Sequence, residues 1–274
     1  MGLPDSVPPL PTTFTPSHRG GSGTPMVCVH GFTDTWRTWE LVLPALEREH
    51  DVLVPTLAGH AGGPEADGDV EEALLGAVER AMDEAGFETA HVVGNSLGGY
   101  VALKLAERGR AKSVVALAPA GGWALDDDSY LGTLDYFTTM QGMLKAAVAH
   151  VELIVTTDEG RRRATQDIVE NYQHIPSELI AHMMQGAATC PGFDELIAHG
   201  RDRGWNLDAE RVTCPVRVVW GTADRILPWP ETAARYREDW LPNADWVELD
   251  GIGHAPQLDV PTEVAELILE FARR

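Results

Sequence analysis

The chain has 274 residues, 44% of them hydrophobic, which is enough for one large domain with a continuous buried core. Its 42 acidic and 21 basic residues give a formal net charge of −21 at pH 7, which argues strongly against a nucleic-acid-binding surface, because phosphate contacts need clustered Lys and Arg. The same charge disfavours anionic membranes, and no stretch of the sequence is long and apolar enough to predict a membrane span.

Strand and helix patterns alternate over the first 109 residues. Short apolar or β-branched runs predict strands near Thr12–Thr15, Met26–His30, Asp51–Pro55 and Ala90–Gly94. Apolar residues at helical spacing predict helices near Arg37–Arg48 and Asp69–Ala85. Such alternation predicts an α/β fold, with a mostly parallel sheet and helices on both of its faces.

A serine between glycines follows the strand that is predicted to end at Gly94. The motif is Gly94-Asn95-Ser96-Leu97-Gly98, and a helix is predicted from Leu97 to Arg108. In such a turn the serine is held in a strained conformation, so the residues two positions to either side must be small. The turn places the Ser96 hydroxyl above the edge of the sheet, and the unpaired N–H of Leu97 favours a developing negative charge. The sequence therefore predicts that Ser96 is a nucleophile.

The predicted strand at Met26–His30 leads into His30-Gly31-Phe32. The Gly94–Gly98 turn has the form of a nucleophile elbow, and together with His30-Gly31-Phe32 it makes the chain resemble the α/β-hydrolase family, whose members carry a His-Gly-aromatic turn after an early strand. The resemblance implies that the main-chain N–H of Phe32 is a second oxyanion donor beside that of Leu97. It also implies a catalytic triad in the chain order Ser, then Asp or Glu, then His.

The two remaining triad residues are expected at the ends of later strands. The run Cys214–Trp220 predicts a buried strand and is followed by Asp224, and the strand predicted at Trp246–Leu249 is followed by His254. Open α/β sheets build their sites at the carboxyl ends of strands. We expect His254 to take the proton of Ser96, and Asp224 to hold the imidazole in the useful tautomer.

Other acidic residues compete for the role of the triad acid. The run Asp126-Asp127-Asp128 follows the strand predicted at Ser113–Leu117, where some family members place the acid. This run is more simply explained as a solvated helix start. Asp34 lies close to the oxyanion turn, but Thr33-Asp34-Thr35 also fits a cap before the next helix, and the cap is the preferred interpretation.

The strand pattern disappears from about Gly121 to Gly204. Amphipathic helices are predicted there near Tyr130–Val151, Asp158–Asn171, Pro176–Ala188 and Phe193–His199. The resemblance implies that residues 121–204 form an all-helical cap, inserted into a hydrolase core of residues 1–120 and 205–274. A cap of this kind excludes water from the nucleophile. The expected pocket residues are Trp123, Phe137, Met140 and Leu227.

The predicted function is hydrolysis of a small to medium neutral carboxylic ester through an acyl-enzyme on Ser96. One alternative is hydrolysis of a carbon–carbon bond in a diketone-like substrate. Asn95 is shared with that subgroup, but the Trp that the subgroup carries shortly after its histidine is missing after His254. Another alternative is a ligand receptor, or a cofactor-free lyase or oxygenase, on the same fold. Ser96 argues against the family's dehalogenases and epoxide hydrolases, which use Asp as the nucleophile.

No metal or organic cofactor is expected. The three cysteines are an odd number at wide spacing, so they predict neither a disulfide framework nor a zinc site. The expected partner is a small hydrophobic substrate, without nucleic acid or membrane. The segment before Pro25 holds no stretch that resembles a signal peptide, so a cytoplasmic location is expected. The sequence leaves the oligomeric state open.

Overall fold

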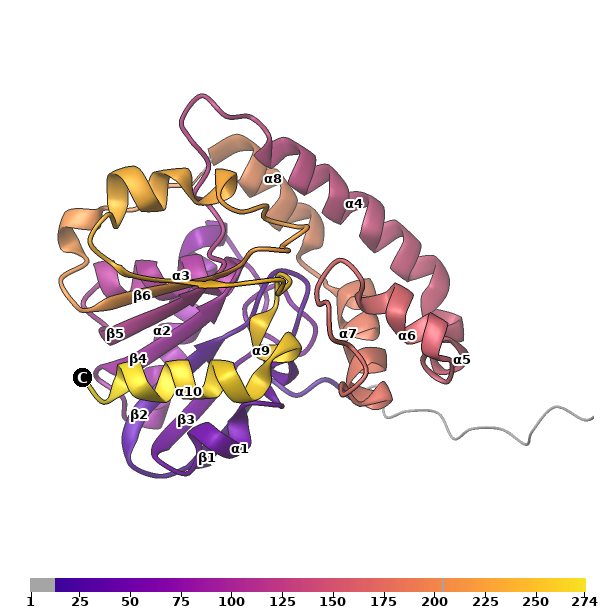
Figure 1. The fold of residues 1–274 in the computed structure, drawn as a ribbon, viewed down its shortest axis with the longest axis horizontal. Coiled ribbons are helices and arrows are strands. Elements are labelled where there is room, and N and C mark those ends of the chain that lie inside the picture. Colours follow the sequence, from indigo (N-terminus) through magenta and orange to yellow (C-terminus); the bar gives the residue numbers. More distant parts are fainter. Residues whose placement is uncertain (1–12, 204) are drawn as a thin grey trace, which may run out of the picture.

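The computed structural model describes residues 13–203 and 205–274, and the centre of this part of the chain is a seven-stranded sheet (Figure 1). The strand order is β1-β3-β2-β4-β5-β6-β7. β1 pairs antiparallel with β3, and every other neighbouring pair is parallel, which confirms the predicted sheet. The strands are β1 (Ser17–Gly21), β2 (Thr24–Val29), β3 (His50–Pro55), β4 (Ala90–Asn95), β5 (Ala111–Leu117), β6 (Val216–Gly221) and β7 (Asp245–Leu249).

Helices cover both faces of the sheet. Successive strand residues point to opposite faces, so Val27 and Val29 of β2 belong to one hydrophobic core, and Met26 and Cys28 belong to the other. α2 and α3 pack into the first core, whereas α1 and α10 pack into the second. The helices of this part are α1 (Leu43–Leu46), α2 (Val70–Ala85), α3 (Leu97–Glu107), α9 (Pro256–Asp259) and α10 (Pro261–Ala272).

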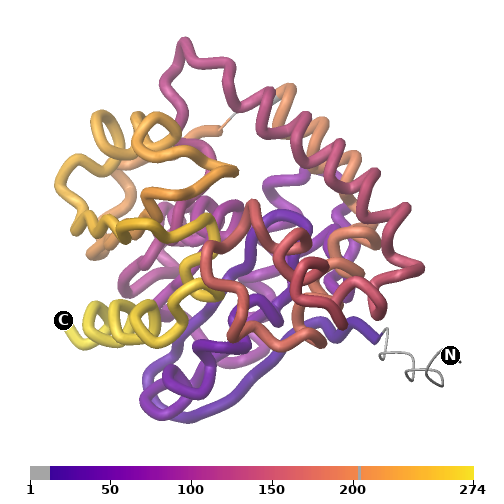
Figure 2. The backbone as a smooth tube through the Cα atoms, turned by 45° about the vertical axis from the view of Figure 1, so that its right-hand side comes forward, coloured from indigo at the N-terminus to yellow at the C-terminus, as the bar shows by residue number. Residues whose placement is uncertain are grey.

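Among the described residues between β5 and β6 there are five α-helices, all within the segment 121–204 that is predicted to be a cap. They are α4 (Tyr130–Ala147), α5 (Val151–Val155), α6 (Asp158–Thr165), α7 (Ser177–Thr189) and α8 (Phe193–Arg203). Figures 1 and 2 show α4 along the upper right of the molecule, with α5, α6 and α7 below it. A third hydrophobic cluster joins α7, through Leu179 and Ile180, to Ala255 and Leu258 of the core. The division into a core and a cap domain stays a prediction.

Short helical turns complete the elements of the described residues. Four are 3-10 turns and one is a π turn: η1 (Trp36–Trp39), η2 (Val148–His150), η3 (Ala209–Arg211), η4 (Glu231–Ala233) and the π turn η5 (Tyr236–Trp240). η2 joins α4 to α5 without a break, so the helix predicted at Tyr130–Val151 is found as α4, η2 and the start of α5.

The first predicted strand is misplaced. Thr12 lies outside the described residues, residues 13–16 are not in a strand, and β1 is Ser17–Gly21. β-branched and aromatic residues favour strands, but Phe14 packs instead against His182 of α7, with ring centroids 4.9 Å apart. β1 is more polar than the predicted run because it is an edge strand, paired only with β3.

The helix predicted at Arg37–Arg48 is divided. The structure has the 3-10 turn η1 at Trp36–Trp39 and the short helix α1 at Leu43–Leu46. Pro44 causes the division, because proline has no N–H and is tolerated only in the first turn of a helix.

The helix predicted at Asp158–Asn171 is too long. α6 ends at Thr165, where the hydroxyl donates to the main-chain oxygen of Arg161 at 2.9 Å. Beyond this point the main chain bonds to a different segment, since the N–H of Ala255 donates to the oxygen of Ile168 at 3.0 Å. A tertiary contact has replaced the helical hydrogen bonds, and periodicity carries no information about such a contact.

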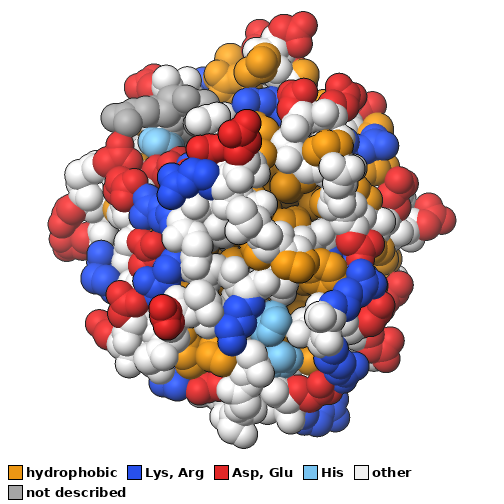
Figure 3. Space-filling model, turned by 90° about the vertical axis from the view of Figure 1, so that its left-hand side faces the viewer, with side chains coloured by type: hydrophobic (Ala, Val, Ile, Leu, Met, Phe, Trp, Pro, Cys, Tyr) orange, Lys and Arg blue, Asp and Glu red, His pale blue; other side chains and the backbone are white. Residues whose placement is uncertain are grey.

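Charged side chains are dispersed over the face of the molecule that Figure 3 shows. Figure 3 shows one face of the molecule, with Asp and Glu side chains around its whole extent, Lys and Arg side chains among them, and hydrophobic side chains near the centre. Some of the cations are paired, as Arg108 is with Glu72 and Glu79 at 2.5 and 3.0 Å. Within the described residues, no helix combines the length and hydropathy needed to cross a bilayer.

Candidate active site

Ser96 lies in the turn between β4 and α3. Its backbone has φ 56° and ψ −120°, which is a strained conformation for a residue with a side chain. The turn requires glycine on either side: a Cβ on Gly94 would lie 2.0 Å from the oxygen of Gly98, and one on Gly98 would lie 2.2 Å from the oxygen of Val29. The N–H of Ser96 donates to the oxygen of Leu117 on β5 at 2.9 Å. The local sequence therefore fixes the serine at the carboxyl end of β4.

Asp224 and His254 form a buried hydrogen-bonded pair. Asp224 Oδ2 lies 2.7 Å from His254 Nδ1, and Asp224 Oδ1 accepts from the N–H groups of Ile226 and Leu227 at 2.9 and 2.7 Å. Because an ionised carboxylate only accepts, Nδ1 carries the hydrogen and Nε2 keeps its lone pair. His254 and Ser96 line the same cavity. The structure thus brings the three predicted triad residues to one site.

Asn95 connects the turn at Ser96 to the loop between β7 and α9 that carries His254, here called the histidine loop. Its Nδ2 donates to the main-chain oxygens of Leu117 and His254 at 3.1 and 3.0 Å, and its Oδ1 accepts from Gln257 Nε2 at 3.0 Å. Both side chains are buried. The hydrogen-bonding groups of the Asn95 amide are therefore used within the protein, and the residue supports the position of the His254 main chain.

Asp259 fastens the histidine loop to the helical insertion. Its Oδ2 accepts from the N–H groups of Gly253 and Glu170 at 2.8 and 2.9 Å, and its Oδ1 accepts from the N–H and the side-chain Nδ2 of Asn171, both at 2.8 Å. Asp259 is 2% exposed. The sequence analysis missed this residue, because a partner 88 positions away leaves no local pattern.

Of the two predicted oxyanion donors, Leu97 directly follows the nucleophile, and Phe32 follows Gly31, which packs against it. Leu97 is the first residue of α3, where an N–H has no helical acceptor. The Gly31 main chain lies against the serine, since a Cβ on Gly31 would be 3.3 Å from Ser96 Cβ. His30 fixes this turn: its Nε2 accepts from the N–H of Leu57 at 2.9 Å, so its Nδ1–H donates to the oxygen of Gly31 at 2.8 Å. Burial lowers the pKa of His30 well below its usual value, which keeps the ring neutral.

Two cavities meet at Ser96. The larger one, of about 630 Å³, lies beneath α4, α5, α6 and α7, and the smaller one, of about 60 Å³, lies among α2, α3, α4 and α8. Of the predicted pocket residues, Met140 lines the larger cavity, Trp123 and Leu227 line the smaller one, and Phe137 lines both. All four therefore border one or both of these spaces.

The competing acids are placed differently. Thr35 is the cap of η1, with its Oγ1 accepting from the N–H of Arg37 at 3.3 Å, so the predicted cap lies in Thr33-Asp34-Thr35. Asp34 accepts from the N–H of Thr35 at 2.8 Å, but it also lines the larger cavity. Burial raises the pKa of Asp34 to about 6, against the opposing effect of its hydrogen bonds.

The run Asp126-Asp127-Asp128 lines neither cavity and precedes α4, where Asp127 Oδ1 accepts from the N–H of Ser129 at 2.8 Å.

Comparison with known proteins identifies the family. Residues 26–267 match the model of a family described as the alpha/beta hydrolase family. The chain belongs to this family. The match begins within β2, includes the helical insertion, and ends within α10. The chain is therefore an enzyme of the hydrolase class, which confirms the resemblance on which the site prediction depended.

The relatives of this α/β hydrolase have different chemistries. It is 35% identical over 197 residues to epoxide hydrolase EphH of Mycobacterium tuberculosis, a match that covers 71% of this chain and 91% of that one. It is 28% identical to the pimeloyl-[acyl-carrier protein] methyl ester esterase of Aromatoleum aromaticum, over 90% and 98% of the two chains. It is 25% identical to the 2-hydroxymuconate semialdehyde hydrolase of Pseudomonas sp. strain CF600, over 93% and 88%.

A solved structure agrees with the fold. The crystal structure of a membrane phospholipase A, a bacterial virulence factor, superposes with a TM-score of 0.74 at 20% identity, and covers 94% of this chain and 83% of that one. Together with the family match, this likeness shows the α/β-hydrolase fold.

Proposed function

We propose that this α/β hydrolase cleaves neutral carboxylic esters through an acyl-enzyme on Ser96. The observation that carries the proposal is the Asp224–His254 hydrogen bond of 2.7 Å at a cavity that Ser96 also lines. A serine hydroxyl is a poor nucleophile at neutral pH, so it needs a base within reach and a third group that orients the base. The three side chains supply these roles.

The reaction has two halves. Ser96 Oγ attacks the ester carbonyl while His254 Nε2 takes its proton, and the N–H groups of Phe32 and Leu97 bind the oxyanion. The bond to the alkoxy oxygen then breaks, and His254 returns the proton to the leaving alcohol. In the second half, water attacks the acyl-enzyme with the same base, which releases the carboxylic acid and restores the serine. Asp224 stabilises the imidazolium that forms in each half.

The charges around the larger cavity favour neutral substrates. Asp34 lines the cavity and carries a negative charge above its raised pKa. Among the described residues that line this cavity, Arg163 is the only Arg or Lys, and its side chain is 71% exposed and paired with Glu159 at 2.6 Å. A carboxylate on the substrate would therefore lose its hydration without gaining a buried cation.

Epoxide hydrolysis fits Ser96 poorly. Opening an epoxide with an aspartate gives an ester, which water can hydrolyse. Opening it with a serine hydroxyl gives an ether, which has no carbonyl carbon for water to attack. Ser96 therefore does not favour epoxide hydrolysis by this chain, although its relative EphH is named an epoxide hydrolase.

Carbon–carbon bond hydrolysis is the second candidate, and the relative from Pseudomonas favours it. Asn95 links this chain to that subgroup in sequence, but the Asn95 amide already bonds to Leu117, His254 and Gln257. Because that network occupies the side chain, Asn95 supports the candidate only weakly.

The test is turnover of a panel with one representative of each chemistry. Phenyl acetate, styrene oxide and a vinylogous 2,6-diketo acid are compared by kcat/KM, with fluorophosphonate labelling of the serine as an independent measurement. We expect phenyl acetate to be cleaved with multiple turnovers and the other two to be cleaved at least about 100-fold less efficiently. Faster turnover of the diketo acid would establish the second candidate, and absence of turnover with labelling also absent would reject the serine-hydrolase mechanism.

A further inference from the structure

The two cavities at Ser96 differ about tenfold in volume and share one boundary. The larger is about 630 Å³ and the smaller about 60 Å³, and Ser96, Phe32 and Phe137 line both. The rings of Phe32 and Phe137 meet edge to face with centroids 5.0 Å apart. A substrate whose carbonyl carbon lies at Ser96 can therefore place one of its two parts in each cavity.

α4 forms part of the roof of both spaces. Tyr130, Leu134 and Phe137 are spaced by one helical turn and line the smaller cavity, and Phe137, Met140 and Leu144 continue the same face along the larger one. The N-terminal half of the helix therefore faces the smaller cavity, and its C-terminal half faces the larger one. Phe137 lies at the boundary between the two cavities and lines both of them.

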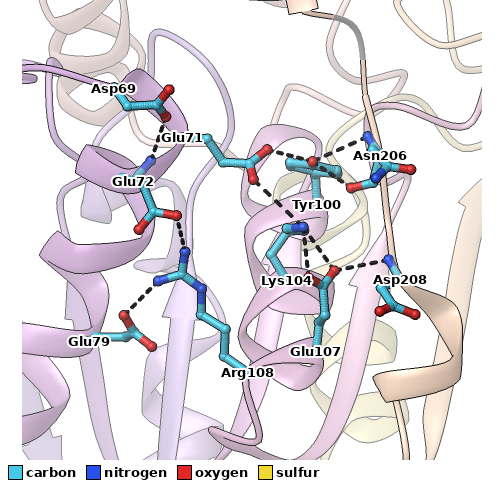
Figure 4. Close-up of polar contacts among 10 residues, drawn as sticks. All are labelled: Asp69, Glu71, Glu72, Glu79, Tyr100, Lys104, Glu107, Arg108, Asn206 and Asp208. Atoms are coloured by element: carbon cyan, nitrogen blue, oxygen red, sulfur yellow. Dashed lines mark hydrogen bonds and ion pairs between the residues drawn. The ribbon is translucent and has the colours of Figure 1, made fainter.

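The far wall of the smaller cavity is held by polar contacts, which Figure 4 shows between α2, α3 and the segment after α8. The hydroxyl of Tyr100, which lines this cavity, lies 2.7 Å from Glu71 Oε2 and 2.8 Å from the main-chain oxygen of Asn206. Lys104 lies 3.6 Å from Glu71 Oε1 and 2.8 Å from Glu107 Oε2. The wall is therefore tied to three separate segments, and we expect it to resist widening.

His254 decides which part of an ester enters which cavity. As the acyl-enzyme forms, His254 must pass its proton to the alkoxy oxygen, and in the second half it must meet the incoming water. His254 lines the larger cavity, and it is not among the residues that line the smaller one. The alkoxy part and the water therefore lie on the side of the larger cavity, which leaves the smaller cavity for the acyl group.

We propose that the smaller cavity is an acyl site for a short, uncharged acyl group and that the larger cavity takes a bulky apolar alcohol. This inference rests on the proposed ester hydrolysis and names the class of ester. Apolar side chains dominate the smaller cavity, including Trp123, Leu134 and Leu227. Its acidic member, Glu71, is bonded to Tyr100 and would repel an acyl group that carried a carboxylate. Esters of the reverse kind, with a long acyl chain and a small alcohol, would not fit.

Hexyl acetate and ethyl hexanoate test the assignment, because they are isomers with the same number of carbons and reversed acyl and alcohol lengths. Hydrolysis is followed in a pH-stat, which needs no chromogenic group. We expect kcat/KM to be at least about tenfold higher for hexyl acetate, since steric rejection in an apolar pocket commonly has this size or more. Equal rates, or a preference for ethyl hexanoate, would overturn the inference while leaving the proposed ester hydrolysis intact.

Two variants on α4 locate the origin of the preference. Leu134→Ala enlarges the smaller cavity, so we expect kcat/KM for ethyl hexanoate to rise and the ratio between the isomers to fall several-fold. Met140→Ala is the matched control six positions along the same helix, and it enlarges only the larger cavity, so ethyl hexanoate should remain the poorer substrate. A ratio that responds to Met140→Ala but not to Leu134→Ala in a folded protein would contradict the assignment.

The failure of the proposed function gives a different result. If hexyl acetate, ethyl hexanoate and phenyl acetate are all left intact, ester hydrolysis itself is rejected and the acyl site is rejected with it. Circular dichroism of each variant establishes that it is folded. If Leu134→Ala is not folded, the comparison of the two isomers on the unaltered protein still decides the proposal.

Discussion

The backbone of Ser96 is strained, with φ 56°, in the turn that places its hydroxyl beyond the end of β4. Replacing Ser96 with Ala keeps the small side chain at φ 56°, so we expect the fold to persist and fluorophosphonate labelling to disappear. Ser113→Ala is the control, since Ser113 is also buried, on the neighbouring strand β5, and bonds to His91 at 2.8 Å. Labelling of each variant is measured by mass spectrometry as the mass added by the fluorophosphonate. Labelling that survives in Ser96→Ala would show that the nucleophile is a different residue.

Asp224 acts through the ring of His254. Asp224→Asn can offer an amide N–H to Nδ1 and so favours the wrong tautomer, which should lower kcat for phenyl acetate about 10⁴-fold. Asp126→Asn should change kcat by less than about threefold, because Asp126 is exposed and lines neither cavity. Steady-state kinetics on both variants checks this ranking, and the opposite ranking would place the triad acid in the loop after β5.

The raised pKa of Asp34 predicts that the stability of the folded protein depends on pH. Its pKa of about 6 in the folded protein lies above the usual value of about 3.9 for an unfolded Asp. The folded state therefore holds this proton more tightly, and its stability falls as pH rises between these two values and stays lower above pH 6. Asp34→Asn removes the charge and keeps an acceptor for the N–H of Thr35, so we expect Tm to rise by about 2–4 °C at pH 7 and little at pH 4.

The control for this effect is Asp128→Asn, since Asp128 is exposed and outside both cavities. Differential scanning fluorimetry at pH 4 and pH 7 gives the comparison. A Tm difference of the same size at both pH values would show that the substitution acts through packing and not through the charge of Asp34.

At the scale of elements, Asp259 ties three segments together: the histidine loop, α9 and the chain after α6. Asp259→Ala leaves buried N–H groups without an acceptor, so we expect the free energy of unfolding to fall by about 2–4 kcal/mol. Because Gly253 precedes His254, the rate of fluorophosphonate labelling should fall as well. Glu248→Ala, an exposed change on β7, is the control. Normal labelling in a destabilised Asp259→Ala protein would limit the residue to a structural role.

The same elements show what the sequence could and could not predict. The elbow was readable because its requirements are local: Gly94, Ser96 and Gly98 lie within five positions and each is needed by the turn. The ends of β6 and β7 were readable from apolar runs, so Asp224 and His254 could be placed. The end of α6 was not readable, because the segment after it bonds to Ala255 and Asp259 instead of continuing the helix.

The residues of the candidate pocket could be predicted from the sequence only in part, because their placement also depends on tertiary packing. Trp123 and Met140 could be named as pocket residues from the sequence, but their assignment to different cavities depends on how α4 packs along both spaces at Ser96. The sequence did not predict that Asp34 lines the larger cavity. The cap sequence Thr33-Asp34-Thr35 already accounts for an aspartate at this position, so nothing pointed to contact with a substrate.

At the scale of the whole molecule, the net charge of −21 acts on every substrate that approaches. Long-range repulsion of an anion is screened by salt, because the Debye length falls from about 30 Å at 0.01 M to about 8 Å at 0.15 M ionic strength. We therefore expect kcat/KM for 4-acetoxybenzoate to rise several-fold over this range, and that of phenyl acetate to stay within about twofold. The two esters share the acetyl group and differ in one carboxylate on the alkoxy part, so their ratio isolates the charge.

The size of the remaining difference at high salt separates the global field from the local one. Salt screens the dispersed surface charges that Figure 3 shows, whereas it screens a carboxylate at the cavity, such as Asp34, much less. We expect 4-acetoxybenzoate to remain the poorer substrate at 0.5 M salt, and Asp34→Asn to reduce that residual difference. Equal kcat/KM values for the two esters at high salt in the unaltered protein would show that surface charge alone excludes anions, and that the cavity makes no selection of its own.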